Sequence, residues 1–519
     1  MPTEPSDIRR SAFLLLTVAT VAIAAAKTVG AENVYEPSRY KPVEKGGYGY
    51  EPDRKWPETR PEPTPTFSSN DKSRWATVRA LVHDGTYVIG KRKYLEPPPE
   101  PTAPQGVIAD LRYDKAVANK YVDVGIVADP AYKSLDIVMN PDTKEFYSSK
   151  PPLMATLVAG EYWVLHRVFD WDIVNDRWLV IPAIVLTWNV VPFAIYLVLL
   201  GRILDSLGKS DFGKLLSFAT ASLGTLLLTF SSTLNNHLPA AFCVFFASYP
   251  LLKSVIENRD MAPWEYAICG FFAAFAATFE LPATAFLVGV GVPLLVARTR
   301  TALLYFIPAA LIPIIALFAC NYVAMGKVLP AYSEFGGPWY NFEGSHWAKR
   351  GTPAAKGIDF NDEPTAVYAF HLSFGHHGWF SLTPVWLVAL LGLIMLGIRS
   401  APSVRALYSK PKGTGWTLEM FAAMTLVISL TVFAFYLTRV QSYNYGGNTS
   451  GPRWLFWLIP LWVLAIPSAA DHLTRSVGGR LFTAILFAAS VFSVFYPAWN
   501  PWRNPWILQL MEFNGWLRY

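Results

Sequence analysis

Charged residues are scarce in this chain. They make up 16% of its 519 residues, whereas soluble chains average about 25%, and hydrophobic residues make up 52%. This balance excludes an ordinary soluble, secreted or disordered protein. A membrane-spanning helix needs roughly 20 mostly apolar residues, so the apolar surplus is enough for about a dozen spans. The composition predicts an all-α polytopic membrane protein.

Cysteine is also rare. The three cysteines, Cys243, Cys269 and Cys320, all lie within apolar runs. This placement excludes a CxxC metal site and argues against a disulfide framework. The net charge of +6 does not indicate a nucleic-acid partner, because the basic residues lie mostly between apolar runs and in one loop.

Clear internal repeats, which mark many transporters, are missing as well. The first apolar stretch, 12–26, follows Arg9-Arg10 and has the form of a signal peptide. Small residues continue past Lys27 to Gly30, which favours an uncleaved first transmembrane helix over residues 1–30. In either case, the chain that follows is expected on the outer side.

The rest of the chain divides into an outer loop, 31–150, and a multi-span domain, 151–519. Spans are predicted near 153–169, 178–200, 214–231, 238–252, 264–279, 281–297, 301–325, 379–398, 416–438, 454–468 and 481–498. Basic segments would stay inside, which places the C-terminus outside and requires an odd number of spans. Twelve runs are counted, so one is re-entrant or a break is missed, and about 11–13 spans are expected.

The outer loop is expected to hold a small α+β region. Proline-rich segments at 35–66 and 96–104 predict an extended strap. Between them, the apolar spacing from Asp71 to Gly85 predicts a short helix on the membrane surface. Two β-prone runs joined at 140–142 predict a hairpin.

Lys150 is followed by Pro151 and Pro152, which suit the first turn of a helix. An ammonium beside the amides that open a membrane helix is a natural anion site, with phosphate the obvious anion at that depth. The alternative is an interfacial lysine whose ammonium extends to the aqueous boundary.

The string Lys-Pro-Pro-Leu after a large outer loop resembles the GT-C glycosyltransferases, the superfamily of aminoarabinose transferase and protein O-mannosyltransferase. A second string, from Asn70-Asp71 to Gly85, resembles the helix with which that family opens its first outer loop. Here Asn70 stands in place of one of the family's two acidic residues, and the segment from Gly85 to Lys150 is longer than in the family.

The resemblance implies an integral-membrane glycosyltransferase at the outer face of the cytoplasmic membrane. Its donor would be a sugar on a polyprenyl phosphate, and its acceptor a hydroxyl of a lipid, glycan or protein, with inversion in a single displacement. A carboxylate must take the acceptor's proton, and Asp71 is the candidate. The alternative is that Asp71 or Asn70 caps the helix. The family has metal-dependent and metal-independent members, so a divalent metal is possible, although no ligand spacing here points to one.

Other polar residues lie near predicted span ends. Arg453 follows a glycine-rich segment, and its guanidinium fork suits phosphate. His376, Tyr445 and Glu280 are possible substrate-binding residues, although an interfacial turn or a span end also accounts for each. Adjacent His376 and His377 do not form a two-histidine metal site by themselves.

Two other functions are compatible with the sequence. A secondary transporter would use the many spans and Glu280, and an envelope scaffold would use the proline-rich strap. The glycosyltransferase hypothesis depends on Asp71, Lys150 and Arg453 meeting at one place beside a hydrophobic channel.

Overall fold

Helices make up 69% of the computed structural model, and a small antiparallel sheet accounts for its strands. The structure describes residues 7–32, 63–94, 121–353, 355, 357–409, 414–497, 500–517 and 519. The chain divides into two compact units. Unit 1 comprises residues 1–65, 181–315 and 356–519, and unit 2 comprises 66–180 and 316–355. The predicted proline-rich segments, 35–66 and 96–104, lie almost entirely outside the described residues.

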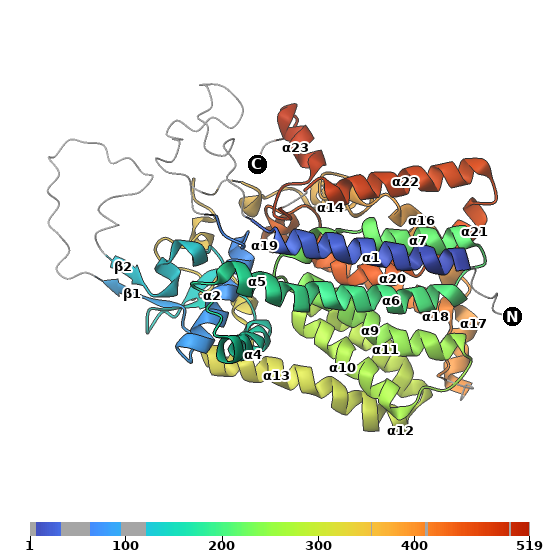
Figure 1. Ribbon diagram of the computed structural model, residues 1–519, viewed down its shortest axis with the longest axis horizontal. Coiled ribbons are helices and arrows are strands. Elements are labelled where there is room, and N and C mark those ends of the chain that lie inside the picture. The colour runs from blue at the N-terminus through green and yellow to red at the C-terminus, as the bar shows by residue number, and fades with distance from the viewer. Residues whose placement is uncertain are drawn as a thin grey trace. The chain divides into compact units, whose positions relative to one another are not determined.

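Unit 1 is a bundle of long apolar helices (Figure 1). Helix α1 (Asp7–Val29) packs against α6 (Val191–Ser206) and α7 (Asp211–Leu223), with Phe13 stacked on Phe218. Helix α9 (His237–Ile256) packs against α6 and against α10 (Pro263–Phe279). The most hydrophobic stretch of the segment Asp211–Ser232, which begins with α7, is 83% buried, and that of α9 is 72% buried, whereas that of α1 is 22% buried. Helices α7 and α9 therefore lie at the centre of the bundle, and α1 lies at its edge.

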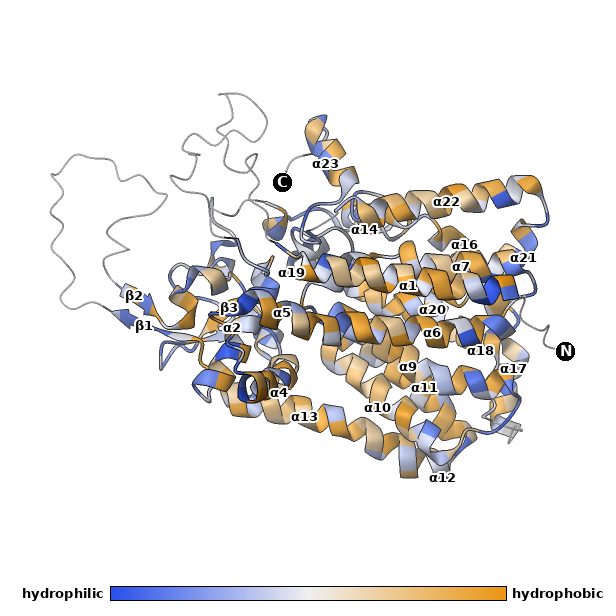
Figure 2. Ribbon diagram, viewed as in Figure 1, coloured by the Kyte–Doolittle hydropathy of each residue, from blue (hydrophilic) through white to orange (hydrophobic). Residues whose placement is uncertain are grey.

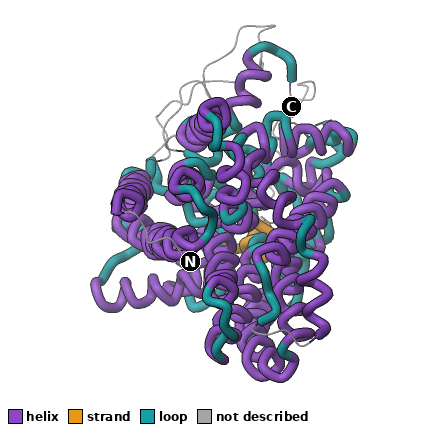
Figure 3. The backbone as a smooth tube through the Cα atoms, turned by 90° about the vertical axis from the view of Figure 1, so that its right-hand side faces the viewer, coloured by secondary structure: helices purple, strands orange, loops and turns teal. Residues whose placement is uncertain are grey.

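The remaining long helices of unit 1 also carry apolar residues on most of their surface (Figure 2). Figure 3 shows many of the helices end on. The other long helices that lie wholly in unit 1 are α11 (Thr284–Ala297), α16 (Trp386–Gly397), α18 (Leu418–Leu437) and α22 (Val477–Phe495). Helix α5 (Arg177–Val185) begins in unit 2 and ends in unit 1, and α13 (Ile307–Met325) begins in unit 1 and ends in unit 2. The shorter helices α20 (Ile459–Val463) and α21 (Ile466–Leu473) form a bent pair. Short helices join them: α8 (Leu226–Thr229), α12 (Thr299–Thr301), α14 (Thr365–Ser373), α15 (Trp379–Leu382), α17 (Ala401–Ala406), α19 (Val440–Tyr443) and α23 (Trp506–Phe513).

Seven helices among the described residues are long and apolar enough to cross a membrane, or eight if the bent pair Arg453–Val463 and Ile466–Leu473 is one span. Two predicted runs form shorter apolar helices, Leu281–Ala297 and Trp386–Gly397. The predicted run 153–169 forms a helix that does not meet the same test, since Glu161, His166 and Arg167 interrupt its apolar surface. A multi-pass membrane protein is supported, but length and composition alone do not reach 11–13 spans.

Unit 2 contains a four-stranded antiparallel sheet in the order β2-β1-β4-β3. Its strands are β1 (Gly90–Tyr94), β2 (Tyr121–Val124), β3 (Ile137–Met139) and β4 (Glu145–Ser148). Strands β3 and β4 pair from Ile137 with Ser148 to Met139 with Phe146, which confirms the predicted hairpin. Val138 and Tyr147 pack with Trp339 and Tyr340 in a hydrophobic cluster, so segment 316–355 completes the core under the hairpin.

Two helices of unit 2 pack against each other: α2 (Ser69–His83) and α4 (Pro152–Phe169). Helix α2 confirms the helix predicted between Asp71 and Gly85, and Gly85 follows it with a φ of +65°, a conformation that glycine adopts without strain. Helix α4 begins at Pro152 as predicted, because proline fits the first turn, where no amide partner is needed.

Candidate functional site

Asp71 lies in the first turn of α2 and is 1% exposed. Ser68 is the N-cap, and its side chain accepts from the Asp71 amide. In return, Asp71 Oδ1 accepts from the Ser68 amide at 2.7 Å and the Lys72 amide at 3.0 Å, and Oδ2 accepts from the Phe67 amide at 3.1 Å. This is the reciprocal capping box that a serine followed three residues later by an acid favours. Asp71 therefore has a capping role, with Ser68 rather than Asn70 or Asp71 as the cap residue itself.

Burial raises the pKa of the Asp71 carboxyl above its ordinary value. The amides of Phe67 and Ser68 and the charge of Lys72 lower the pKa, but burial has the larger effect. A carboxylate whose pKa lies closer to neutrality is a better proton acceptor at working pH than an exposed aspartate. The environment of Asp71 is thus compatible with both capping and general-base chemistry.

Lys150 lies two residues before α4 and forms an ion pair in the same unit. Its Nζ donates to Asp136 Oδ1 at 2.9 Å, and the lysine and aspartate side chains are 22% and 13% exposed. The ammonium is therefore half-buried at the N-terminus of a long helix, as the sequence predicted, but it already has an anionic partner. No local sequence pattern pointed to Asp136, which lies just before β3.

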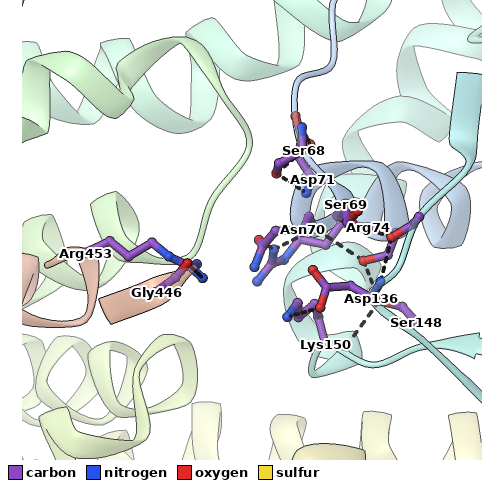
Figure 4. A network of polar contacts seen from close by, with 12 residues as sticks. Ser68, Ser69, Asn70, Asp71, Arg74, Asp136, Ser148, Lys150, Gly446 and Arg453 are labelled. Carbon is purple, nitrogen blue, oxygen red and sulfur yellow. Dashed lines mark hydrogen bonds and ion pairs between the residues drawn. The ribbon is translucent and has the colours of Figure 1, made fainter. Parts of the chain in front are cut away.

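A hydrogen-bond network joins the first turn of α2 to the Lys150 segment (Figure 4). On one side, Ser134 Oγ donates to the carbonyl of Ser69 and accepts from the Asp136 amide. On the other side, Ser148 Oγ donates to Ser73 Oγ at 3.1 Å and accepts from the Lys150 amide at 3.2 Å. The turn that carries Asp71 and the segment that carries Lys150 are thus held together by short polar contacts from both sides.

Arg74 is the residue of this region that the sequence reasoning missed. It is 3% exposed, and its Nη1 donates to the backbone and side-chain oxygens of Asn70. The neutral Asn70 side chain thus holds a guanidinium. Arg74 lies one helical turn after Asp71, and this spacing is the only sequence signal that could have identified it.

A small cavity lies beside both cations. Its volume is about 10 Å³, which is room for about one water-sized group and not for a whole phosphate. The lining comes from α2, β4, the start of α4 and the end of α13: Arg74, Thr77, Tyr87, Tyr147, Ser148, Lys150, Pro151, Pro152, Ala155, Ala324 and Met325. One phosphate oxygen matches this size, and two cations among the lining residues favour an anionic one.

Arg453 and Glu280, both in unit 1, are joined through a histidine. Arg453 Nη1 donates to His237 Nε2 at 3.0 Å, and Nη2 donates to the carbonyl of Gly446 at 3.1 Å. His237 Nδ1 contacts Glu280 Oε1, to which the Asn236 amide also donates. Since Nε2 accepts from a guanidinium, the imidazole hydrogen is on Nδ1 and faces the carboxylate. His237 starts α9 and Glu280 ends α10, so this network ties the ends of neighbouring elements together.

The glycines near Arg453 leave space that other side chains of the protein occupy. A side-chain carbon at Gly446 would lie 3.0 Å from Arg453 Nε, and one at Gly447 would lie 2.5 Å from Asp359 Oδ1. Both have positive φ angles, +94° and +70°. Glycines beside an arginine can allow the backbone to approach a ligand closely. In the structure, the close approach is to neighbouring side chains.

His376 and Tyr445, two predicted substrate-binding residues, lie in one buried cluster of unit 1. The Tyr445 ring stacks on His377 at 5.4 Å between centroids and meets the His376 ring edge-on at 4.7 Å. All three side chains are fully buried. The His377 imidazole also donates from Nε2 to the carbonyl of Thr449. The predicted aromatic interface turn is therefore an interior cluster, closed to a sugar in this conformation.

The described parts of the chain contain no group of three or more His, Cys, Asp or Glu residues arranged to hold a metal ion. No protein-family model, curated protein or solved structure matches this chain. Asp71 and Lys150 belong to one network in unit 2, whereas Arg453, Glu280, His376 and Tyr445 belong to unit 1.

Proposed function

We propose that this protein is an integral-membrane glycosyltransferase of the GT-C type. It transfers a sugar from a polyprenyl phosphate to an acceptor hydroxyl of a lipid, glycan or protein at the outer face of the cytoplasmic membrane. The observation that supports this proposal best is the network that joins the Asp71 turn to Lys150, with Arg74 and Lys150 lining one cavity. The long apolar helices are compatible with a protein that binds a polyprenyl lipid within a membrane.

In the proposed reaction, the acceptor oxygen attacks the anomeric carbon as the bond from that carbon to the phosphate oxygen breaks. The bonding electrons leave with the polyprenyl phosphate, and the acceptor's proton passes to a base. Asp71 is this base, or it positions the acceptor, and burial strengthens it as a base by raising its pKa. Lys150 stabilises the charge that grows on the leaving phosphate.

Arg74 is a second cation for that phosphate. Arg74 and Lys150 both line this cavity, so both could donate to one phosphate oxygen placed in it. Asp136 balances Lys150 before the donor binds, and the phosphate would take over that role. The assignment of Arg453 as a further phosphate ligand remains a prediction.

The test is the release of free polyprenyl phosphate by purified protein supplied with a lipid extract from cells that produce it. We expect release by the wild type and a loss of at least about 100-fold in Asp71→Asn. Asp84→Asn is the matched control, since Asp84 ends the same helix and is exposed. Equal release by Asp71→Asn would remove Asp71 from the mechanism. Solute uptake into proteoliposomes without release of polyprenyl phosphate would favour a transporter instead.

A further inference from the structure

A chain of hydrogen bonds runs through the buried cluster of unit 1. His377 Nε2 lies 3.1 Å from the carbonyl oxygen of Thr449, and His377 Nδ1 lies 2.6 Å from His376 Nδ1. His376 Nε2 lies 2.6 Å from the hydroxyl of Tyr519, and that hydroxyl lies 3.0 Å from Glu363 Oε1. The chain thus consists of four contacts between a carbonyl at one end and a carboxyl at the other.

These four contacts need four hydrogens. A carbonyl and a carboxylate only accept, so every hydrogen must come from the two imidazoles and the phenol between them. Two neutral histidines and one tyrosine supply three. If Glu363 is ionised and both histidines are neutral, one contact brings two acceptors together in a buried place, which is costly.

We propose that this cluster is a proton-binding site, in which one additional proton is held along the chain from Glu363 through Tyr519 to His376. In one arrangement the proton is on Glu363, which donates to Tyr519. In the other it is on a histidine, and Tyr519 donates to the carboxylate. The two arrangements interconvert when the hydrogen of each contact moves from its donor atom to its acceptor atom. The extra proton is therefore shared by the hydrogen-bonded groups and is not assigned to one residue.

The neighbouring groups disfavour the arrangement with the proton on a histidine. Burial lowers the pKa of His376 far below its ordinary value and that of His377 to about 3, so both imidazoles resist a positive charge. His371 on α14 stacks on His376 with ring centroids 4.1 Å apart and would also be repelled by an imidazolium. Burial raises the pKa of Tyr519, which keeps the phenol hydrogen in place.

Three other titratable groups face the cluster. Tyr445 donates its hydroxyl hydrogen to Glu363 Oε2, and Tyr368 on α14 packs against the Tyr445 ring. Glu512 on α23 acts on Tyr519 through its charge. Tyr445 can donate to a protonated or an ionised Glu363, so its contact does not change the hydrogen count.

The cluster joins three segments that are distant in sequence: residues 363–377, the turn at 445–449, and Tyr519. Loss of the proton leaves two acceptors facing each other and loosens these connections. The folded protein holds a proton that an unfolded chain with ordinary pKa values has lost above about pH 7. The contribution of the cluster to stability therefore falls as the pH rises above that value.

The first experiment is infrared spectroscopy of the full-length protein in detergent near neutral pH, with nitrogen NMR of labelled histidines. We expect a protonated-carboxyl band that disappears in Glu363→Gln and remains in Glu343→Gln, where the exposed Glu343 is replaced. Asp71 can produce a similar band, and comparison with Glu363→Gln separates the two. A doubly protonated His376 or His377 without that band would also support the extra proton. Neutral histidines together with no Glu363 band would overturn the proposal.

The second experiment follows thermal unfolding from pH 7 upward. In the wild type, loss of one proton should raise the unfolding equilibrium constant about tenfold per pH unit until the site is empty. A glutamine at position 363 supplies an N–H for Tyr519 at every pH and still accepts from Tyr445. Glu363→Gln should therefore unfold near the wild-type temperature at neutral pH without the alkaline decline, and Glu363→Ala should be less stable throughout. An unchanged alkaline decline in Glu363→Gln would contradict the proposal.

Discussion

Lys150 and Asp136 of unit 2 are 22% and 13% exposed and form an ion pair, and Lys150 also lines a cavity. In unit 1, His376 and His377 are fully buried, and both nitrogens of each ring have a partner. An ammonium with one half-buried counter-ion can exchange it for a ligand phosphate with little rearrangement. A closed chain of buried contacts cannot accept a ligand without losing one of them.

Residues of the same type have different surroundings in the two units. Arg453 and Arg74 are both suited to phosphate, but Arg453 is held by His237 and Gly446, whereas Arg74 is held by Asn70 and lines a cavity. We therefore expect variants in the unit 2 network to change sugar transfer first and variants in the unit 1 networks to change stability first.

Replacing Lys150 should have the largest effect. Lys150→Ala removes an ammonium that we propose stabilises the leaving phosphate, and loss of one such group typically lowers turnover by about 100-fold to 1000-fold. The measurement is release of polyprenyl phosphate at saturating donor. Lys133→Ala, at an exposed lysine of the same unit, should keep wild-type turnover. Wild-type turnover in Lys150→Ala would contradict the proposal that the unit 2 network, and not the unit 1 networks, acts in transfer.

Replacing Glu280 tests whether the hydrogen-bond networks of unit 1 serve stability. Glu280→Ala removes a buried carboxylate that accepts from the Asn236 side-chain amide and from the Nδ1–H of His237, at an expected cost of about 3 kcal/mol of unfolding free energy. Glu280→Gln keeps an acceptor oxygen and should cost less than about 1 kcal/mol. Denaturant midpoints of the purified proteins measure both. If Glu280→Gln is fully stable but inactive, Glu280 belongs to the substrate site after all.

The pH dependence of transfer sharpens the role of Asp71. Burial raises its pKa above the ordinary value of 3.8, so the ionised form that a base requires is lost at a higher pH than for an exposed aspartate. Below the raised pKa, turnover should fall about tenfold per pH unit. The sign for stability is opposite: ionisation of Asp71 opposes folding, so its contribution falls as the pH rises through that pKa. A pH–rate profile of the wild type is the measurement, and an acid limb at or below pH 3.8 would contradict this role.

Local sequence patterns predicted much of unit 2. The helix from Asp71 to Gly85, the hairpin at 140–142 and the start of α4 at Pro152 each depend on residues close together in the chain. Asp136 could not be predicted as the partner of Lys150, because that contact depends on how the hairpin packs. Long-range contacts explain the failures in unit 1 as well: Glu363 and Tyr519 are 156 positions apart, and no local pattern pairs them.

The number of spans was harder to predict for another physical reason. An apolar run marks burial, but both a lipid-facing helix and the interior of a bundle need apolar residues. Helix α16 has 12 residues, which is about 18 Å of helix and less than the roughly 30 Å hydrocarbon core of a bilayer. The helix bounds in the structure show which apolar runs are long enough to cross a bilayer.

Replacing Ser68 should have the smallest effect and separates the two roles of Asp71. Ser68→Ala removes the hydroxyl of the capping box but leaves the backbone amides of Ser68 and Phe67 on the Asp71 carboxylate, so about 1 kcal/mol of stability should be lost. Ser69→Ala is the control, because only the Ser69 carbonyl takes part in the network. Since the carboxylate stays in place, Ser68→Ala should keep near wild-type turnover, in contrast to Asp71→Asn. Equal losses of turnover in both variants would show that Asp71 acts in transfer only by holding the first turn of α2.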